Sequence, residues 1–569
     1  MAKRKFVLVI LSLVVVLIIT ACFFLFIKNK KITSRLQYPD ANVILILIDT
    51  LRADHLGCYG YPRNTSPEID KLAKEGIIFK NMLAQTSWTR PGTASILSGL
   101  YPKNHGANTR EDSLAEEINL LPEILGKYGY TSYAFVANGN AGLPVGFNQG
   151  YKKFFSFPER LNKDPLNIHV RSDMVNESLL KFIRKLEDTS NNFIYVHYMD
   201  PHAPYIPKEK HFSKSNKMMF PIDFFRSGTI HSLDEDKQRQ AVEEMINAYD
   251  DEILYNDKMI GCLLQTLKMK NMYSNSIIII TSDHGEEFFE HGDLSHGLTL
   301  YDEQLKVPLI IRLPDKIHMT IDEIANQVDI CPTVLSLLKI PIPKYIDGIN
   351  LLNNKKDPKP YSYAELHKDR FVFSSIQTST DKLIEGIRLP PPQEFKHRWF
   401  NEKAVIETGE NSLELVVRSF LKDRTIRVLS DGQPVKEFVI TEKKQVFNIP
   451  LPKSGKKKIV TIKSLTPCEP LENPGKNQKK QCLAFCIYNS RNVNLKNVVG
   501  EFRKEYYVLA EDPGEGKNQY KLKKFKKTIM LLRKKLKDYL LNKNVTPLSK
   551  KPVIFDQEQL KALKALGYI

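Results

Sequence analysis

Two predicted strands end in side chains that can bind a metal ion. Asp49 closes the apolar run that begins at Asn42, and Asp283 and His284 directly follow the run 277–282. Ligands of open parallel sheets bind outside the carboxyl ends of the strands, so these three side chains are expected to converge. Their oxygen and nitrogen atoms suit a hard or borderline divalent cation. The sequence therefore predicts one or two ions of Ca²⁺, Mn²⁺, Mg²⁺ or Zn²⁺.

The Asp-His pair by itself is also compatible with a structural role, in which the aspartate caps a turn and the histidine packs in the core. The residues after the pair favour a functional site, because they form a dense segment of further side chains that can act as ligands. These are Glu286, Glu287, His291 and His296.

A hydroxyl side chain, Thr89, stands just before Pro91-Gly92 and a predicted helix that ends near Ser98. Proline is favoured in the first turn of a helix because no N–H donor is needed there. The free N–H groups and the dipole of such a helix attract an anion. A hydroxyl held there beside a metal ion could lose its proton and attack phosphorus or sulfur. From the local sequence alone, Thr89 is also a candidate for the N-cap of the helix.

The region from residue 41 to residue 385 alternates strand and helix patterns. Its continuous apolar runs are typical of strands that are buried on both faces of a parallel sheet. Strand–helix alternation predicts a doubly wound α/β domain, which we expect to be catalytic. The predicted strands are 42–49, 133–137, 193–197, 276–281 and 308–312, and the predicted helices are 67–75, 93–98, 120–128, 174–188, 243–268 and 329–338.

The pattern changes near residue 385. Three prolines at 390–392 are followed by short alternating runs with turn residues between them, as in a small antiparallel sandwich. We expect residues 386–495 to be a β-rich insert, which is either a structural element or a binding module. Residues 496–569 are expected to form a C-terminal subdomain with a basic amphipathic helix. The apolar positions of that helix are Leu522, Phe525, Ile529, Leu532 and Leu536.

The composition is that of a folded protein, with 42% hydrophobic and 26% charged residues in a chain of 569. The net charge of +18 is unevenly distributed, since ten Lys or Arg and no acidic residue lie between Lys517 and Lys537. No zinc-finger spacing or aromatic RNA-binding pattern accompanies this stretch, so nucleic acid is not an expected partner. A solvated helix face, or a face against anionic lipid, is expected instead.

The N-terminus indicates export. An uninterrupted apolar run covers residues 6–27, and as a helix of ~1.5 Å rise per residue it is roughly 33 Å long, enough to cross a bilayer core. We expect a cytoplasmic tail (1–5), a transmembrane signal-anchor (6–27) and a linker (28–40), with the catalytic domain outside the cytoplasm. Two alternatives also export the chain: a lipoprotein processed at Cys22, and a cleaved signal peptide.

Several ordered motifs resemble those of a known family. They are Leu47–Gly57, Thr89–Pro102, Val196–Tyr205, Ser282–Glu286, His296-Gly297, Tyr301–Glu303, Val307-Pro308, Asp512–Glu515 and Leu563–Tyr568. Together they resemble the sulfatase-like branch of the alkaline phosphatase superfamily, mainly over residues 41–385. The resemblance implies the same α/β fold. It also implies an enzyme with one or two divalent metal ions that hydrolyses or transfers sulfate or phosphate esters.

The chain departs from that family at the position where sulfatases make formylglycine. Sulfatases convert a Cys or Ser that is followed by Pro two residues later and by Arg four residues later. Here Thr89 occupies the converted position, with Pro91 in place and Thr93 instead of the Arg, and Asp49-Thr50 replaces the double Asp of many sulfatases. A threonine nucleophile beside Asp and Asp-His ligands is similar to phosphoethanolamine transferases and lipoteichoic acid synthases, which implies phosphoester chemistry.

The resemblance also implies roles for individual positions. The implied metal ligands are Asp49, Thr89, Asp283 and His284. The implied catalytic residues are Thr89, as the nucleophile, and His202 and His296, which would contact the transferred anion or a second ion. One of these two histidines is expected to protonate the leaving group. The positions implied for substrate binding are Arg52, Trp88, His197 and Asp200. Arg52 is equally compatible with a charge on a helix surface.

We therefore expect a metal-dependent hydrolase or transferase that acts on an ester of a lipid, a glycan or a polymer. Two alternatives stay open. One is a sulfuric ester hydrolase of the arylsulfatase type that works without formylglycine. The other, from a different class, is a non-catalytic protein that binds anions or glycans at the cell surface. The presence of the whole set of possible ligands favours an enzyme.

Overall fold

The computed structural model describes most of the chain between residues 36 and 541. The described ranges are 36–157, 170–214, 230, 233–353, 361–368, 371–388, 397–470 with short gaps, 482–488 without 484, and 501–541. Residues 1–35, which include the predicted tail, the predicted anchor and Cys22, lie outside these ranges, as does the motif at 563–568. Within the ranges, no helix is both long enough and apolar enough to cross a membrane.

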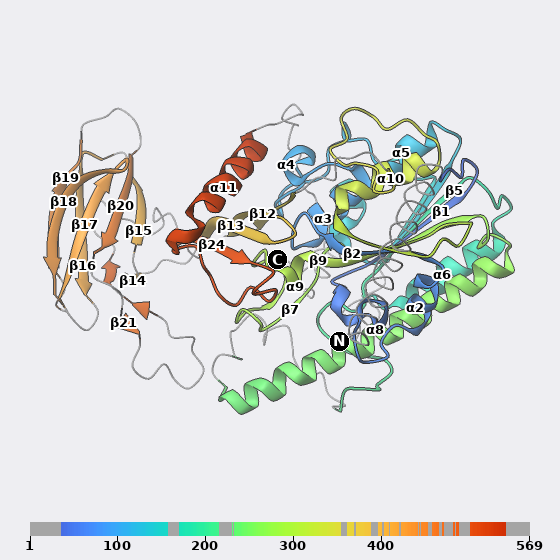
Figure 1. Ribbon diagram of the computed structural model, residues 1–569, viewed down its shortest axis with the longest axis horizontal. Coiled ribbons are helices and arrows are strands. Elements are labelled where there is room, and N and C mark those ends of the chain that lie inside the picture. The colour runs from blue at the N-terminus through green and yellow to red at the C-terminus, as the bar shows by residue number, and fades with distance from the viewer. Residues whose placement is uncertain are drawn as a thin grey trace, which may run out of the picture.

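An eight-stranded sheet is the centre of the α/β unit (Figure 1). Its strands are β1 (Asn42–Ile48), β2 (Gly76–Leu83), β3 (Thr131–Val136), β4 (Lys153–Ser156), β5 (Asn192–Tyr198), β6 (Ser276–Thr281), β9 (Lys306–Arg312) and β10 (Met319–Asn326). Their order is β10-β2-β9-β6-β1-β5-β3-β4, and β1 pairs in parallel with both β5 and β6. The predicted α/β fold with a mainly parallel sheet is confirmed.

One strand runs against the others. The apolar run 308–312 belongs to β9, which is antiparallel to β2 and to β6. The expectation that this run is a parallel strand is therefore wrong. A continuous apolar run indicates that both faces of a strand are buried, and β9 is buried along nearly its whole length. Burial of both faces does not fix the direction of the strand.

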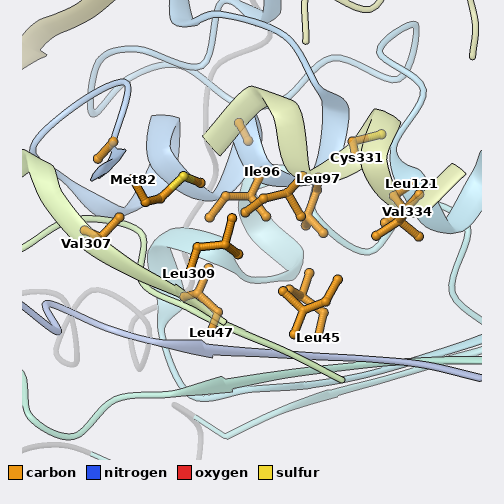
Figure 2. Close-up of a cluster of buried hydrophobic side chains, with 14 of the residues drawn as sticks. Leu45, Leu47, Met82, Ile96, Leu97, Leu121, Val307, Leu309, Cys331 and Val334 are labelled. Carbon is orange, nitrogen blue, oxygen red and sulfur yellow. The ribbon is translucent and has the colours of Figure 1, made fainter. Parts of the chain in front are cut away.

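Helices cover both faces of the central sheet. The described α-helices of the whole chain, not all of which pack on this sheet, are α2 (Pro67–Ala73), α3 (Thr89–Ser98), α4 (Pro102–His105), α5 (Leu121–Gly126), α6 (Ser172–Lys185), α8 (Glu235–Met269), α9 (Asp302–Leu305), α10 (Ile330–Leu337) and α11 (Lys526–Leu541). Successive side chains of β1 point to opposite faces. Leu45 and Leu47 share one core with Ile96 of α3 and Val334 of α10 (Figure 2). Ile46 belongs to the other core, which α2, α6 and α8 cover.

A second, antiparallel sheet is built from segments on either side of the predicted insert. Its strands, in sheet order, are β11 (Ser362–Lys368), β12 (Phe371–Gln377), β13 (Asp381–Arg388) and β24 (Glu501–Val508). Helix α11 packs against β12 and β13 (Figure 1). The two-stranded pairs are β7 (Glu287–Phe288) with β8 (Leu294–Ser295), and β21 (Glu469–Pro470) with β22 (Cys482–Leu483).

The remaining strands form the predicted sandwich. One sheet is β14 (His397–Phe400), β23 (Phe485–Tyr488), β16 (Ser412–Ser419) and β19 (Gln445–Pro450). The other is β15 (Lys403–Thr408), β20 (Lys458–Ser464), β17 (Arg424–Ser430) and β18 (Gln433–Ile440). Both are antiparallel and enclose a core of their own, to which Leu415 and Val428 contribute from opposite sheets.

Leu45→Ala should destabilise the α/β unit, because it removes a fully buried side chain between the sheet and α3. The expected loss of unfolding free energy is about 2–5 kcal/mol. Leu143→Ala shortens a side chain that is 40% exposed, and its effect is expected to stay within about 0.5 kcal/mol. Urea unfolding followed by near-ultraviolet circular dichroism compares the two variants. Equal transition midpoints would contradict the core role of Leu45.

Candidate metal centre and active site

Polar side chains from three neighbouring strands meet at the carboxyl edge of the central sheet. Asp49 follows β1, His197 lies near the end of β5, and Asp283 and His284 follow β6. All four are fully buried. Leu47 of β1 pairs with Thr281 of β6, so the two aspartates each stand two residues beyond a paired position. Parallel pairing in this register therefore brings the predicted ligands together.

Asp49, Asp283 and His284 form a compact group with ligand atoms within 4.8 Å of one another. The Nε2 atom of His284 lies 3.7 Å from Asp49 Oδ1 and 3.5 Å from Asp283 Oδ2. Among the described residues, these same two carboxylate oxygens are buried without a hydrogen-bond partner. A buried carboxylate oxygen without a partner is costly. The donor set therefore fits a divalent cation.

Local hydrogen bonds orient this group. The Nδ1 atom of His284 donates to the Gly285 carbonyl at 2.9 Å, so Nε2 is the ring nitrogen that faces the two carboxylates. Oδ1 of Asp283 accepts hydrogen bonds from the backbone N–H groups of Thr50 (3.3 Å) and His284 (3.0 Å). Its second oxygen, Oδ2, is thereby directed at the centre.

The two carboxylates differ in acidity. Burial opposes ionisation of Asp49, but the hydrogen bond from His197 and the nearby charges of His202 and His284 lower its pKa to about 2. Burial, and next the negative charge of Asp49, raise the pKa of Asp283 to about 6. Repulsion between the carboxylates thus opposes the doubly ionised form. A bound divalent cation would relieve that repulsion.

Thr89 is the first residue of α3, and Trp88 occupies the N-cap position. The Oγ1 atom of Thr89 lies 3.4 Å from His284 Nε2 and 3.4 Å from the Nδ2 atom of Asn138. The same Asn138 group donates to Asp49 Oδ2 at 2.5 Å. The hydroxyl therefore faces the metal centre and does not cap the helix.

The first turn of α3 contains Gly92 because a larger residue would not fit there. A Cβ atom on Gly92 would lie 2.7 Å from the carbonyl oxygen of Asp283. Only glycine lets the helix approach the ligand loop so closely. Gly92 thus sets the distance between Thr89 and the metal centre.

His202 and His296 lie beside this centre. Their ring centroids are 4.9 Å apart, and the ring of His296 is 4.3 Å from that of His284. Nδ1 of His202 donates to the Ala203 carbonyl at 2.5 Å. Nδ1 of His296 is 2.9 Å from Oε1 of Glu286, a buried carboxyl. The structure brings both histidines together with the ligand group.

The four residues predicted to bind substrate lie in different environments. His197 contacts Asp49 Oδ2 at 3.3 Å, and Trp88 is buried next to Thr89. Arg52 is buried, not on a helix surface, and it pairs with Asp54 and Glu290.

Asp200 is buried and contacts the start of α6. It accepts a hydrogen bond from the backbone N–H of Ser172 at 2.6 Å, at the start of α6. Its observed contacts thus hold that helix.

Two residues of the site were not predicted. Asn138 follows β3 at the same edge of the sheet as Asp49, so its position at a strand end is a usable signal. Lys368 ends β11 of the second sheet, where no motif marks it. Its Nζ atom lies 5.7 Å from the ring centre of Trp88 and 3.5 Å from the carbonyl oxygen of His296. This ammonium brings a positive charge to the rim of the centre.

A second acidic group, Glu287, His291 and Glu303, also has closely spaced ligand atoms. Its atoms are occupied by hydrogen bonds. Nδ1 of His291 contacts Glu303 at 2.5 Å and Nε2 contacts the Glu515 carbonyl at 3.2 Å, while Glu287 accepts from the Gln304 side chain at 2.9 Å. We interpret this group as structural.

The α/β fold with an acidic–histidine group at its strand ends agrees with a family match that makes the protein a hydrolase of the alkaline phosphatase superfamily. The model of the family described as Sulfatase matches residues 41–340. This match covers more than half of the chain, and the protein belongs to the sulfatase family. Members of this superfamily use a divalent metal ion, in agreement with the ligand group found here.

Similar proteins include several named sulfatases. An arylsulfatase of Clostridium perfringens is 25% identical over 373 residues, which are 54% of this chain and 77% of the relative. An ulvan-active sulfatase of Formosa agariphila is 26% identical over 449 residues, covering 72% of this chain and 71% of the relative.

Solved structures support the fold. A phosphonate monoester hydrolase of Agrobacterium radiobacter matches with a TM-score of 0.57 at 15% identity, over 90% of this chain and all of the other. A structure solved with its substrate D-glucosamine-2-N,6-O-disulfate matches with a TM-score of 0.57 at 16% identity, over 88% of this chain and 97% of the other.

Asp283→Asn should weaken divalent-metal binding by ~10-fold or more, because it removes a ligand charge at the centre. Inductively coupled plasma mass spectrometry after equilibrium dialysis measures the metal content. Asp322→Asn, at an exposed aspartate of β10, is the control and should bind like the wild type. Unchanged metal content in Asp283→Asn would contradict the proposed ligand group.

Proposed function

We propose that this protein is a metal-dependent hydrolase or transferase of phosphate or sulfate esters in which Thr89 is the nucleophile. The observation that carries the proposal is the position of Thr89 Oγ1. It lies 3.4 Å from His284 Nε2. The same histidine nitrogen is close to Asp49 Oδ1 and Asp283 Oδ2, two buried oxygens for which the described residues provide no hydrogen-bond partner. A divalent ion bound here supplies positive charge that favours the deprotonated hydroxyl and balances the ester anion.

The residues around Thr89 support in-line attack. Asn138 donates toward Thr89 Oγ1 and holds Asp49, so the hydroxyl and the ligand group keep a fixed geometry. The N-terminus of α3 and the ammonium of Lys368 attract the tetrahedral anion. The hydroxyl proton of Thr89 passes to water, and the bond from Thr89 Oγ1 to phosphorus or sulfur forms as the bond to the leaving oxygen breaks. His202 or His296 donates the proton that the leaving oxygen needs.

Phosphoester chemistry is slightly favoured over sulfate chemistry. A threonine adduct has no second hydroxyl on its β-carbon, so it must be released by a further attack of water or an acceptor alcohol on the transferred group. Thr93 also replaces the arginine that accompanies formylglycine formation. The second candidate is a sulfuric ester hydrolase without formylglycine, and the names of the relatives favour it.

The substrate is proposed to be an ester on a lipid, a glycan or a polymer outside the cytoplasm. The apolar run 6–27 supports a membrane anchor, with lipidation at Cys22 as the alternative. Glycan substrates are supported by relatives such as an N-acetylglucosamine-6-O-sulfatase of Bacteroides thetaiotaomicron. A non-catalytic binding protein is the remaining alternative, and purified protein without a bound divalent ion would favour it.

Thr89→Ala should lose turnover by on the order of 10³-fold or more, because it removes the hydroxyl that forms the adduct. Thr89→Ser keeps the hydroxyl and should keep most of the activity. Paired assays with bis-p-nitrophenyl phosphate and p-nitrophenyl sulfate identify the preferred ester. Full turnover of Thr89→Ala against both substrates, with metal content unchanged, would overturn the mechanism.

Replacing the leaving-group acid should affect esters unequally. His202→Gln or His296→Gln, whichever removes the donor, should slow alkyl esters by on the order of 10²–10⁴-fold. Nitrophenyl esters should be affected much less, since nitrophenolate leaves without a proton. Steady-state kinetics of both variants on matched alkyl and aryl esters gives the comparison. Equal losses on both esters in both variants would rule out this role for either histidine.

A further inference from the structure

Helix α11 has a buried apolar side. Ile529, Leu532 and Leu536 are buried against the second sheet, in a cluster with Ile376 of β12 and Leu383 of β13. The helix therefore lies along the sheet with one face fully used for packing (Figure 1). Side chains on its other face are exposed within the described part of the chain.

The opposite face combines positive charge with exposed apolar side chains. At about 3.6 residues per turn, Lys527, Met530, Leu531 and Lys534 lie away from the buried side. Met530 is 59% exposed and Leu531 is 52% exposed. Leu522, just before the helix, is 48% exposed. The exposed lysines of this surface are Lys517, Lys521, Lys523, Lys524, Lys526, Lys527, Lys534, Lys535 and Lys537.

We propose that this basic face, residues 517–537, docks onto the surface of an anionic lipid bilayer. Clustered lysines next to a membrane are attracted by anionic headgroups, and exposed Met and Leu side chains gain by entering the boundary of the acyl chains. A face that contacts only water is not expected to expose three large apolar side chains among its lysines. The apolar run 6–27 of the same chain supports a bilayer nearby.

A polyanionic glycan is the other class of partner that a basic surface can bind. The observations favour lipid, because the exposed cations are all lysines. Arginine suits bidentate binding of sulfate better, and the single arginine of the stretch, Arg533, pairs with Glu385. Leu522, Met530 and Leu531 would also gain nothing from a sulfated chain.

Docking of this face would orient the active site. The Nζ atom of Lys103 in α4 donates to the carbonyl of Tyr539 in α11 and lies 4.1 Å from the centre of its ring. Helix α4 directly follows α3, which begins with Thr89. A bilayer held against α11 therefore fixes the orientation of the helix that carries the nucleophile.

The test is quenching of an indole placed in the basic face. The full chain carrying Leu531→Trp is mixed with vesicles that contain brominated phosphatidylcholine, either alone or in equal parts with phosphatidylglycerol. Quenching is expected only with the anionic vesicles, because contact requires the headgroup charge. Leu143→Trp, at an exposed leucine of the α/β unit, is the matched control and should not be quenched beyond the wild type.

Charge reversal makes the test specific. Adding Lys523→Glu, Lys527→Glu and Lys534→Glu should abolish the quenching, whereas the same change at Lys152, Lys181 and Lys185 should not. Circular dichroism and metal content verify that each variant is folded. Absence of quenching in anionic vesicles overturns the proposal. So does retention on a heparin column that depends on the three lysines while the introduced indole stays unquenched, since that result identifies a polyanion surface.

Discussion

Two carboxylates buried side by side at the ends of β1 and β6 are the constraint on which the rest of the site depends. Parallel pairing of Leu47 with Thr281 brings Asp49 and Asp283 together, and their negative charges repel in a medium that screens poorly. Hydrogen bonds from Asn138 and His197 stabilise the charge on Asp49. Within the described part of the chain, one oxygen of each carboxylate, Oδ1 of Asp49 and Oδ2 of Asp283, has no hydrogen-bond partner. The sheet thus places at its carboxyl edge a group of side chains that could hold a divalent cation.

The helix that carries Thr89 is fitted to the same site. Trp88 takes the N-cap position, and the hydroxyl of Thr89 lies 3.4 Å from both His284 Nε2 and Asn138 Nδ2. Gly92 allows close packing against the carbonyl of Asp283. Thr89 differs from an ordinary helix cap because its hydroxyl is buried and lies close to His284. The local sequence alone could not show this difference.

The sequence predicted those strands and site residues that depend on a local pattern. The apolar runs located β1, β5 and β6, and Asp49 and Asp283 were found because each follows such a run. The direction of β9 was missed, because burial of both faces does not depend on direction. Lys368 was missed for another reason. It comes from an antiparallel sheet that meets the site only through tertiary packing, and no local pattern encodes that contact.

The second sheet, which includes β24 from the C-terminal part of the chain, is also tied to the α/β unit by a buried charge bridge. Lys382 of β13 is fully buried and bridges Asp302 and Glu515 at 2.6 and 2.7 Å. Breaking such a buried bridge leaves an uncompensated charge, so it holds the second sheet firmly to the start of α9. The same sheet carries Lys368 to the rim of the metal centre and supports α11 on its other side. The proposed bilayer contact of α11 and the proposed anion site near Thr89 therefore involve the same sheet.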